Sequence, residues 1–470
     1  MPIYNAPIQD MKFILNDVFN AADFWQKNEQ LAHVDSDTVN MILEEMSKFA
    51  KNTLLPINRS GDEEAAQYLG EGKVKTPTGF KAAFDEYAQG GWIGLGGDPN
   101  HGGQGMPKMV TMLAEEMVFT ANQSFALYPN LSGGACMCIY NAGSEEQKQT
   151  YLEKIYSGEW TGTMCLTEPH AGTDLGIIKT KAVPNQDGSY SITGTKIFIT
   201  AGEHDLADNI IHLVLAKTPD APAGSKGISL FIVPKFHVNA DGSLGERNAV
   251  SCGSIEHKMG IKASATCVMN FDGAKGFMVG AENTGLASMF IMMNYERLTM
   301  GLQGIGGAEL AYQNATAYTL DRIQGRADSG IQEPNKAADP IVFHADVRRM
   351  LLNAKTISEA SRCFAMYVAK ELDTNKYTDD AEARKAADDR VALLTPVAKA
   401  FLTDRGLEAS IDAQQCFGGH GYIREWGMEQ IVRDTRISQI YEGTNGIQSL
   451  DLLGRKVVKN GGAFVTTYVQ

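Results

Sequence analysis

The chain has 470 residues, of which 43% are hydrophobic and 21% charged, and its net charge is −14 at pH 7. This length predicts about three domains, and the composition is that of an ordinary globular protein. The acidic balance argues against a nucleic-acid partner, because binding to a phosphate backbone requires clustered Lys and Arg. The sequence holds no run of about 18 apolar residues, so we expect no membrane-spanning helix, and its first residues do not resemble a signal peptide.

Seven cysteines are scattered along the chain. Their odd number in a long chain argues against a disulfide framework and favours a reducing compartment, which predicts a cytoplasmic protein. Cys136 and Cys138 are the only close pair. Their spacing fits no common zinc site, so we interpret them as small buried residues and predict no metal site.

The first third of the chain is predicted to be mainly helical. Residues 36–150 carry apolar side chains at the spacing of one helical face, and Ser36 is a plausible N-cap for the first clear helix. The apolar face of that helix consists of Val39, Ile42, Leu43, Met46 and Phe49.

The pattern changes near Gly162 to short runs rich in Ile, Val, Phe and Thr. Residues 196–200, 210–215 and 228–233 are examples of these predicted strands. Asp-Gly pairs at 187–188, 241–242 and 272–273 predict tight turns between strands, so the middle of the chain is predicted to be an antiparallel β domain.

From about Leu286 the pattern is helical again. Long segments cover roughly 286–324, 341–372 and 380–415, and the polar segment 325–340 with its Gly and Pro residues is predicted to be a loop.

The segment Tyr441–Gln448 is the strongest candidate for a catalytic site. Glu442 stands between an aromatic residue and a glycine, and a carboxylate there can act as a general base if an apolar pocket raises its pKa. Thr444 or Asn445 can cap the helix that follows, and Gly443 lets the backbone pass close to a ligand.

Three further segments are candidates, each with an ordinary alternative. The loop Thr167–Asp174 offers hydroxyls and backbone N–H groups to a planar heterocycle, or is an ordinary turn. Phe198–Thr200 places an aromatic beside a hydroxyl, or is an ordinary strand. In Gln415–Tyr422, Gly418 and Gly419 allow a close approach to a phosphate or ring, or end a helix.

These four segments, in their order and approximate spacing, resemble the acyl-CoA dehydrogenase family of flavoenzymes, over roughly residues 36–456. The resemblance implies an α+β fold with an N-terminal α-helical domain, a middle antiparallel β-barrel-like domain and a C-terminal four-helix bundle. The expected boundaries are an N-terminal extension 1–35, the three domains 36–161, 162–285 and 286–456, and a tail 457–470.

The resemblance also implies a role for individual residues. Glu442 matches the catalytic base. The positions that match FAD contacts are Thr167, Phe198, Thr200, Arg322, Gln324, Gln415, Gly418, Gly419 and Thr444. The positions that match the acyl-CoA site are Thr173, Arg297, Tyr441 and Gly443.

The chain departs from the family pattern at several positions. Phe198 replaces a more frequent Trp but keeps a stacking surface, and Gly446 stands where a Gln often contacts FAD. The aromatic that usually follows the Arg322 position is absent, with Gly325 near its place. Glu296 falls where some branches of the family carry their base, so it is the alternative to Glu442.

The implied reaction is α,β-dehydrogenation of an acyl-CoA to a trans-2-enoyl-CoA, with FAD as cofactor. The implied partners are an electron-transfer flavoprotein as electron acceptor and further copies of the chain in a homodimer or homotetramer. An acyl-CoA oxidase and a non-catalytic flavoprotein offshoot of the family are the alternatives.

Segments at both ends resemble one long-form bacterial branch, which includes 3-methylmercaptopropionyl-CoA dehydrogenases. Its members usually continue into a further helical domain, and the tail 457–470 lies where such a domain would begin.

Overall fold

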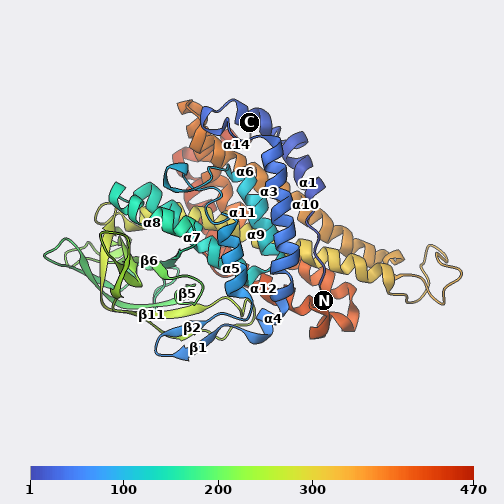
Figure 1. Cartoon of the computed structure of the whole chain (residues 1–470). Helices are drawn as coiled ribbons and strands as arrows, with labels where there is room; N and C mark the ends of the chain where they lie inside the picture. Colours follow the sequence, from blue (N-terminus) through green and yellow to red (C-terminus); the bar gives the residue numbers. More distant parts are fainter. Residues whose placement is uncertain (1, 470) are drawn as a thin grey trace.

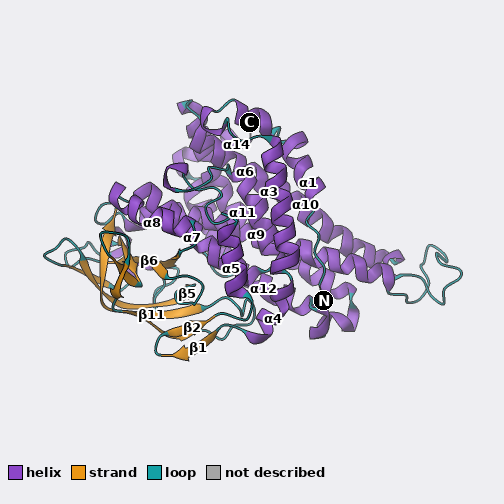
Figure 2. Cartoon of the chain, viewed as in Figure 1, coloured by secondary structure: helices purple, strands orange, loops and turns teal. Residues whose placement is uncertain are grey.

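The computed structural model describes the backbone of residues 2–469, and the side chains of all of these except residues 294, 459, 460, 464 and 467. A β-sheet occupies one side of the molecule and a large body of helices the other (Figure 2). The helices come from the two ends of the chain and the sheet from its middle, so the predicted fold class is confirmed. Within the described residues, every helix is too short or too polar to span a membrane.

The N-terminal helices pack around a shared apolar core with the later parts of the chain. The predicted amphipathic helix is α3, which buries Val39, Leu43, Met46 and Phe49. Its N-cap is Asp35, whose side chain accepts a hydrogen bond from the backbone N–H of Thr38, so the prediction of Ser36 as N-cap was wrong by one residue. The helices of this part are α1 (Ile8–Phe13), α2 (Ala21–Gln26), α3 (Ser36–Phe49), α4 (Pro56–Glu64), α5 (Phe80–Gln89), α6 (Lys108–Ala121), α7 (Gln123–Ala142) and α8 (Glu145–Tyr156).

A small hairpin interrupts these helices. Strands β1 (Gln67–Gly70) and β2 (Lys73–Lys75) pair antiparallel, and the Tyr68 hydroxyl donates a 3.3 Å hydrogen bond to the carbonyl of Cys252 in the middle domain. The sequence did not indicate this hairpin, since the segment is short and its partner is remote in the chain.

The middle domain is a twisted sheet with the strand order β3-β6-β7-β11-β5-β4 and β10 also paired to β11. Its strands are β3 (Trp160–Cys165), β4 (Lys181–Pro184), β5 (Tyr190–Thr200), β6 (Asn209–Ala216), β7 (Ser229–Pro234), β10 (Val250–Ile255) and β11 (Thr266–Val279), and β8 (Phe236–Val238) with β9 (Leu244–Arg247) forms a separate hairpin.

The sheet differs from the predicted antiparallel domain with tight turns in two respects. Strands β3 and β6 pair in parallel. Between them the chain forms β4 and β5 at the other end of the sheet and then crosses back, so that β6 lies beside β3. The Asp-Gly pairs at 187–188 and 241–242 lie in turns as predicted, whereas Asp272-Gly273 lies inside β11, where the pairing with β5 shifts register. The pair therefore forms a bulge that bends one long strand.

The C-terminal part is built on three long helices. They are α9 (Gly285–Asp321), α10 (Ala345–Tyr377) and α11 (Ala381–Cys416), followed by α12 (Met428–Arg436), α13 (Asn445–Asp451) and α14 (Ala463–Val469). Helix α9 runs through the centre of the helical body and packs against α6, α7, α10 and α11. The far ends of α9 and α10 project away from the sheet, with the loop 325–340 at their tip (Figure 1).

Candidate active site

Glu442 lies in a tight turn between the short 3₁₀ segment Ile437–Gln439 and helix α13. Its φ of 54° is in the left-handed region that non-glycine residues rarely adopt, and Gly443 follows with φ 80°. The Gln448 side chain donates to the carbonyls of both residues at 3.3 and 3.1 Å, and Thr444 caps α13 by accepting from the N–H of Ile447. A strained backbone held by surrounding contacts is a feature of functional sites.

The electrostatic surroundings of Glu442 suit a base. Partial removal from water raises the pKa of the Glu442 carboxyl, while the positive charges of Arg297 and Lys399 lower it. The carboxylate is thus more basic than in water, yet two cations help to keep it ionised.

The two cations come from different helices. Arg297 of α9 is largely buried, with Nη1 3.7 Å from Oδ2 of Asp451, and burial lowers its pKa. Lys399 of α11 is fully buried and donates a 2.9 Å hydrogen bond to Oδ1 of Asn445, three residues after Glu442. Burial lowers the pKa of Lys399 to about 8, against the attraction of Glu442 and Asp404.

Sequence reasoning missed Lys399. The signal was present, because a lysine within the apolar run Pro396–Phe401 is rarely buried without a charged or polar partner.

Glu296 is the second carboxyl of the site. It is fully buried on α9, and its Oε2 accepts a hydrogen bond from the side-chain amide of Asn130 on α7. Its Oε1 has no hydrogen-bond partner among the described residues. Burial, and then the charge of Glu442, raises the pKa of Glu296 well above its ordinary range, against the hydrogen bond from Asn130, so Glu296 gives up its proton less readily than a carboxyl in water.

Tyr441 is half-buried, and its hydroxyl donates a 2.5 Å hydrogen bond to Oε1 of Gln303 on α9. The structure therefore brings together the predicted residues Glu442, Tyr441, Gly443, Thr444 and Arg297 in one region between α9, α11 and α13, with Glu296 beside them.

Three of the four predicted residues of the middle domain gather around β5. The N–H of Ile197 donates a 2.9 Å hydrogen bond to the carbonyl of Thr167, which ties the loop to the strand. The β5–β11 register slips at this point, and Phe198 takes a φ of 58° with its side chain 59% exposed. A large aromatic forced outward by a bulge presents a free face for stacking. Thr200, two residues on, is half-buried, and Thr173 is exposed on the loop.

A buried ion pair that sequence reasoning missed holds this loop. Lys196, which is fully buried, lies 3.0 Å from Oε1 of Glu168 and also donates to the carbonyl of Leu166. Glu168 further accepts from Thr180, through both its backbone N–H and its hydroxyl. Glu168 is therefore a structural residue, and the loop that carries Thr167 is rigid at its base.

The remaining predicted residues form a separate exposed group at the far end of α9. They are Arg322, Gln324, Gln415, Gly418 and Gly419. The Tyr318 ring stacks on Phe417 at 4.1 Å and its hydroxyl lies 2.9 Å from Nδ1 of His420, so the end of α9 and the loop after α11 are adjacent. At a rise of 1.5 Å per residue, Arg322 lies about 37 Å along the helix from Arg297.

A cavity of about 840 Å³ lies between α6, α7, the start of α9 and the end of α10. Asn130 and Tyr295 line it, so the cavity reaches the Asn130–Glu296 contact. In the part of the chain that the structure describes, no group of three or more His, Cys, Asp or Glu side chains is arranged to hold a metal ion.

Comparisons with known proteins agree with this architecture. Models of the acyl-CoA dehydrogenase N-terminal, middle and C-terminal domains match residues 36–159, 163–274 and 283–457. The 3-methylmercaptopropionyl-CoA dehydrogenase of Ruegeria pomeroyi is 45% identical over 462 residues, which cover 98% of this chain and 77% of that protein. The chain belongs to the acyl-CoA dehydrogenase family. This relative also confirms the resemblance to the branch with 3-methylmercaptopropionyl-CoA dehydrogenases.

Solved structures are similar to this chain over most of its length. The butyryl-CoA dehydrogenase of Megasphaera elsdenii superposes with a TM-score of 0.73 at 26% identity, covering 90% of this chain and 98% of that chain. A chain of a structure described as "Electron transferring flavoprotein of Acidaminococcus fermentans" gives 0.74 at 26% identity, covering 91% and 99%.

Proposed function

We propose that this family member is an FAD-dependent acyl-CoA dehydrogenase that forms a trans-2-enoyl-CoA, with Glu442 as the base that removes the α-proton. The observation that carries the proposal is the strained turn of Glu442, whose carboxyl has a raised pKa and lies in the field of two buried cations. A weakly acidic C–H group requires a base that is stronger than a carboxylate in water and held in place.

Arg297 and Lys399 stabilise the ionised form of Glu442 before the proton moves. When Glu442 takes up the proton, its negative charge disappears from this region and develops on the thioester oxygen. The donors and cations around the turn are fixed beforehand by α9, α11 and α13, so little reorganisation accompanies this transfer.

Glu296 is the less suitable base in this chain. It is fully buried, its Oε2 accepts from Asn130, and burial and the charge of Glu442 raise its pKa well above the ordinary range, so its carboxylate form is costly in this site. Glu442 is only half-buried and stands in a turn beside Gly443.

The proposed FAD site is divided between two subunits. Thr167, Phe198, Thr200 and Thr444 would hold the flavin end in the chain's own site, where the exposed ring of Phe198 offers a stacking surface. When bound, FAD would accept the β-hydride of the substrate. The second FAD-binding group is Arg322, Gln324, Gln415, Gly418 and Gly419. The distance of about 37 Å along α9 from Arg297 to Arg322 favours a contact of this group with a neighbouring subunit's cofactor.

The acyl-CoA would lie against Thr173, Arg297, Tyr441 and Gly443. The cavity beside Asn130 offers room for the acyl group beyond the reacting carbons, with both apolar and polar side chains in its wall. The relatives named above make butyryl-CoA and 3-methylmercaptopropionyl-CoA the first substrates to test. An electron-transfer flavoprotein is the proposed electron acceptor.

The test is an anaerobic titration of the FAD-loaded protein with these two acyl-CoAs, followed by loss of flavin absorbance. We expect bleaching with at least one of them, and none with Glu442→Gln. Full bleaching of Glu442→Gln would contradict the assigned base, and a protein that binds no FAD would contradict the function. In air, stoichiometric peroxide formation during turnover would instead indicate the oxidase alternative.

A further inference from the structure

We propose that Gln303, a buried glutamine of α9, is a positioning residue that holds Tyr441 and thereby the adjacent Glu442. The inference rests on the proposed function, in which Glu442 is the base. Gln303 is fully buried, and its Oε1 accepts the 2.5 Å hydrogen bond from the Tyr441 hydroxyl. Glutamine is seldom fully buried, and its amide then needs partners for both its oxygen and its nitrogen.

The nitrogen of the Gln303 amide fixes the direction of its oxygen. Nε2 donates to Oε1 of Gln123 at 2.8 Å and to the backbone carbonyl of Asp434 at 3.2 Å. A backbone carbonyl can only accept, so the NH₂ end must face Asp434, which leaves the oxygen toward Tyr441. Gln123 in turn donates at 3.2 Å to the hydroxyl of Thr435.

Glycines on α9 bring the neighbouring elements within reach of this amide. A Cβ on Gly304 would overlap the backbone of Leu402 on α11, and one on Gly307 would overlap the hydroxyl of Thr435 on α12. Because α9 can approach both helices this closely, the Gln303 side chain reaches α7, α12 and the Glu442 turn at once.

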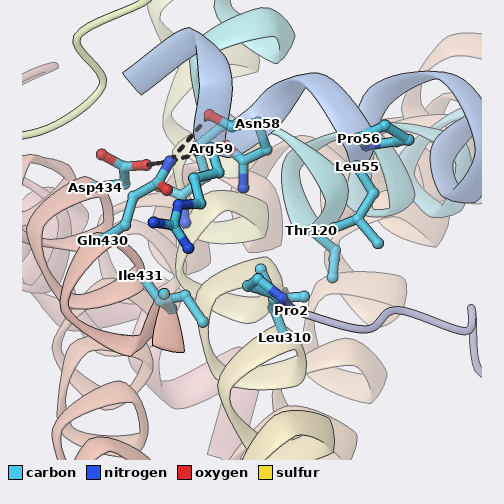
Figure 3. A pocket seen from close by; sticks show the side chains of 12 residues that line it. Pro2, Leu55, Pro56, Asn58, Arg59, Thr120, Leu310, Gln430, Ile431 and Asp434 are labelled. Carbon is cyan, nitrogen blue, oxygen red and sulfur yellow. Dashed lines mark hydrogen bonds between the residues drawn. The ribbon is translucent and has the colours of Figure 1, made fainter. Parts of the chain in front are cut away.

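The other end of the network is anchored in the scaffold. Gln123 and Asp434 both line a cavity of about 220 Å³, and Figure 3 shows Asp434 beside Gln430 in its wall. There the Gln430 side chain donates to the carbonyl of Asn58 at 3.2 Å and to Oδ2 of Asp434 at 3.3 Å. The network therefore links Tyr441 to α4, α7, α9 and α12, and none of these belongs to the turn itself.

The consequence concerns the left-handed backbone of Glu442. On its C-terminal side the turn is held by Gln448 and by the Thr444 cap. On its N-terminal side, the Tyr441 hydroxyl anchors the residue adjacent to Glu442, through Gln303. Without that anchor the turn gains freedom to rotate, and a small displacement of a base from its reacting C–H costs up to about a hundredfold in rate.

The experiment compares three substitutions in the FAD-loaded enzyme with butyryl-CoA and 3-methylmercaptopropionyl-CoA. Gln303→Met keeps the length of the side chain and removes its hydrogen bonds, Tyr441→Phe removes the same contact from the other side, and Gln313→Met makes the same change elsewhere on α9. Gln313 is half-buried and bonds the backbone of Asn5.

We expect Gln303→Met to lower kcat about tenfold to a hundredfold with a change in KM below about threefold. The isotope effect with α-deuterated substrate should rise, because proton removal then limits the rate. Adding Tyr441→Phe to Gln303→Met should cost little more, since both remove one contact. Gln313→Met should keep the kcat and isotope effect of the wild type.

A wild-type kcat in Gln303→Met, or fully additive losses in the double variant, would overturn the inference. If Gln303→Met does not fold with FAD, Tyr441→Phe tests the inference alone, because this variant leaves the Gln303–Gln123 pair intact. An unchanged kcat and isotope effect in Tyr441→Phe would then refute the inference.

Glu442→Gln, measured in parallel, separates the assignment of the base from the positioning role of Gln303. An active Glu442→Gln overturns the base assignment and this inference together, whereas an inactive one beside a normal Gln303→Met overturns this inference alone.

Discussion

Asn130 donates a hydrogen bond from its side-chain amide to Oε2 of Glu296, and this contact gives the two carboxyl groups of the site different environments. Glu296 is enclosed, with Gly134 so close that a Cβ there would overlap Oε1. Glu442 stands in a half-buried turn with the cations Arg297 and Lys399 nearby. Burial therefore opposes ionisation at both carboxyls, but the charge of Glu442 opposes it further at Glu296, whereas two cations favour it at Glu442.

Substitution by glutamine should therefore affect the two carboxyl positions differently. Glu442→Gln is expected to lower the rate of flavin reduction by about 10²–10⁴, the usual contribution of a positioned general base, with FAD still bound. Glu296→Gln should cost less than about tenfold, since the amide oxygen can still accept the hydrogen bond from Asn130 and Glu296 is not the proposed base. Stopped-flow reduction by butyryl-CoA measures both, and the opposite ranking would move the base to Glu296.

Lys399 should set the pH at which Glu442 becomes ionised. Its positive charge lowers the pKa of Glu442, so Lys399→Met should raise that pKa and move the acid limb of the kcat–pH profile upward by about one pH unit. Arg297 acts in the same direction and remains in the variant. Lys385→Met, which removes an exposed lysine of α11 paired with Asp389, is the control and should leave the acid limb in place. A downward shift in Lys399→Met would contradict the assigned electrostatics.

Arg322 should contribute to cofactor retention across a subunit boundary. Arg322→Ala is expected to weaken FAD binding about tenfold, as the loss of one charge-assisted contact to a phosphate does, without altering the Glu442 turn. Fluorescence of released flavin and the mass of the assembly in solution measure the two effects. Arg405→Ala, which removes an exposed arginine paired with Glu408, is the matched control. A monomer that holds FAD fully would argue against a site shared between subunits.

Asp434 should make stability depend on pH. Burial, and then Asp62, raises the pKa of Asp434 to about 7, while the N–H of Ile261, Arg433 and Gln430 oppose this. A raised folded-state pKa stabilises the protein below the unfolded pKa near 4, and this contribution is lost as pH rises toward 7. Asp434→Asn should therefore gain stability relative to the wild type between pH 4 and 7, by at most about 1.4 kcal/mol per pH unit.

Thermal unfolding of both proteins across pH 4–8 measures this difference. Asp389→Asn, which removes the partner of the exposed Lys385 on α11, should show a constant offset over the same range. A difference that stays constant as pH rises would show that Asp434 is ionised in the folded protein throughout.

The prediction of the fold from sequence succeeded where the signal is local. The buried face of α3, the strands β5, β6 and β7, and the three long helices follow from periodicity, which depends on residues a few positions apart. The prediction was wrong at Asp272-Gly273, because the same dipeptide serves a turn or a bulge and only the partner strand decides. The parallel pairing of β3 with β6 is likewise a matter of topology.

The sequence by itself determined which residues are candidates for the chemistry. Glu442, Phe198 and Arg297 lie in motifs whose order and spacing identify the family, since such motifs are contiguous in the chain. Only the tertiary structure decided how these residues are supported. Asn130 lies 166 positions from Glu296, Gln303 lies 138 positions from Tyr441, and Lys399 reaches Asn445 from a different helix. Contacts of this range depend on how closely α7, α9 and α11 pack, and periodicity along one segment carries no information about that distance.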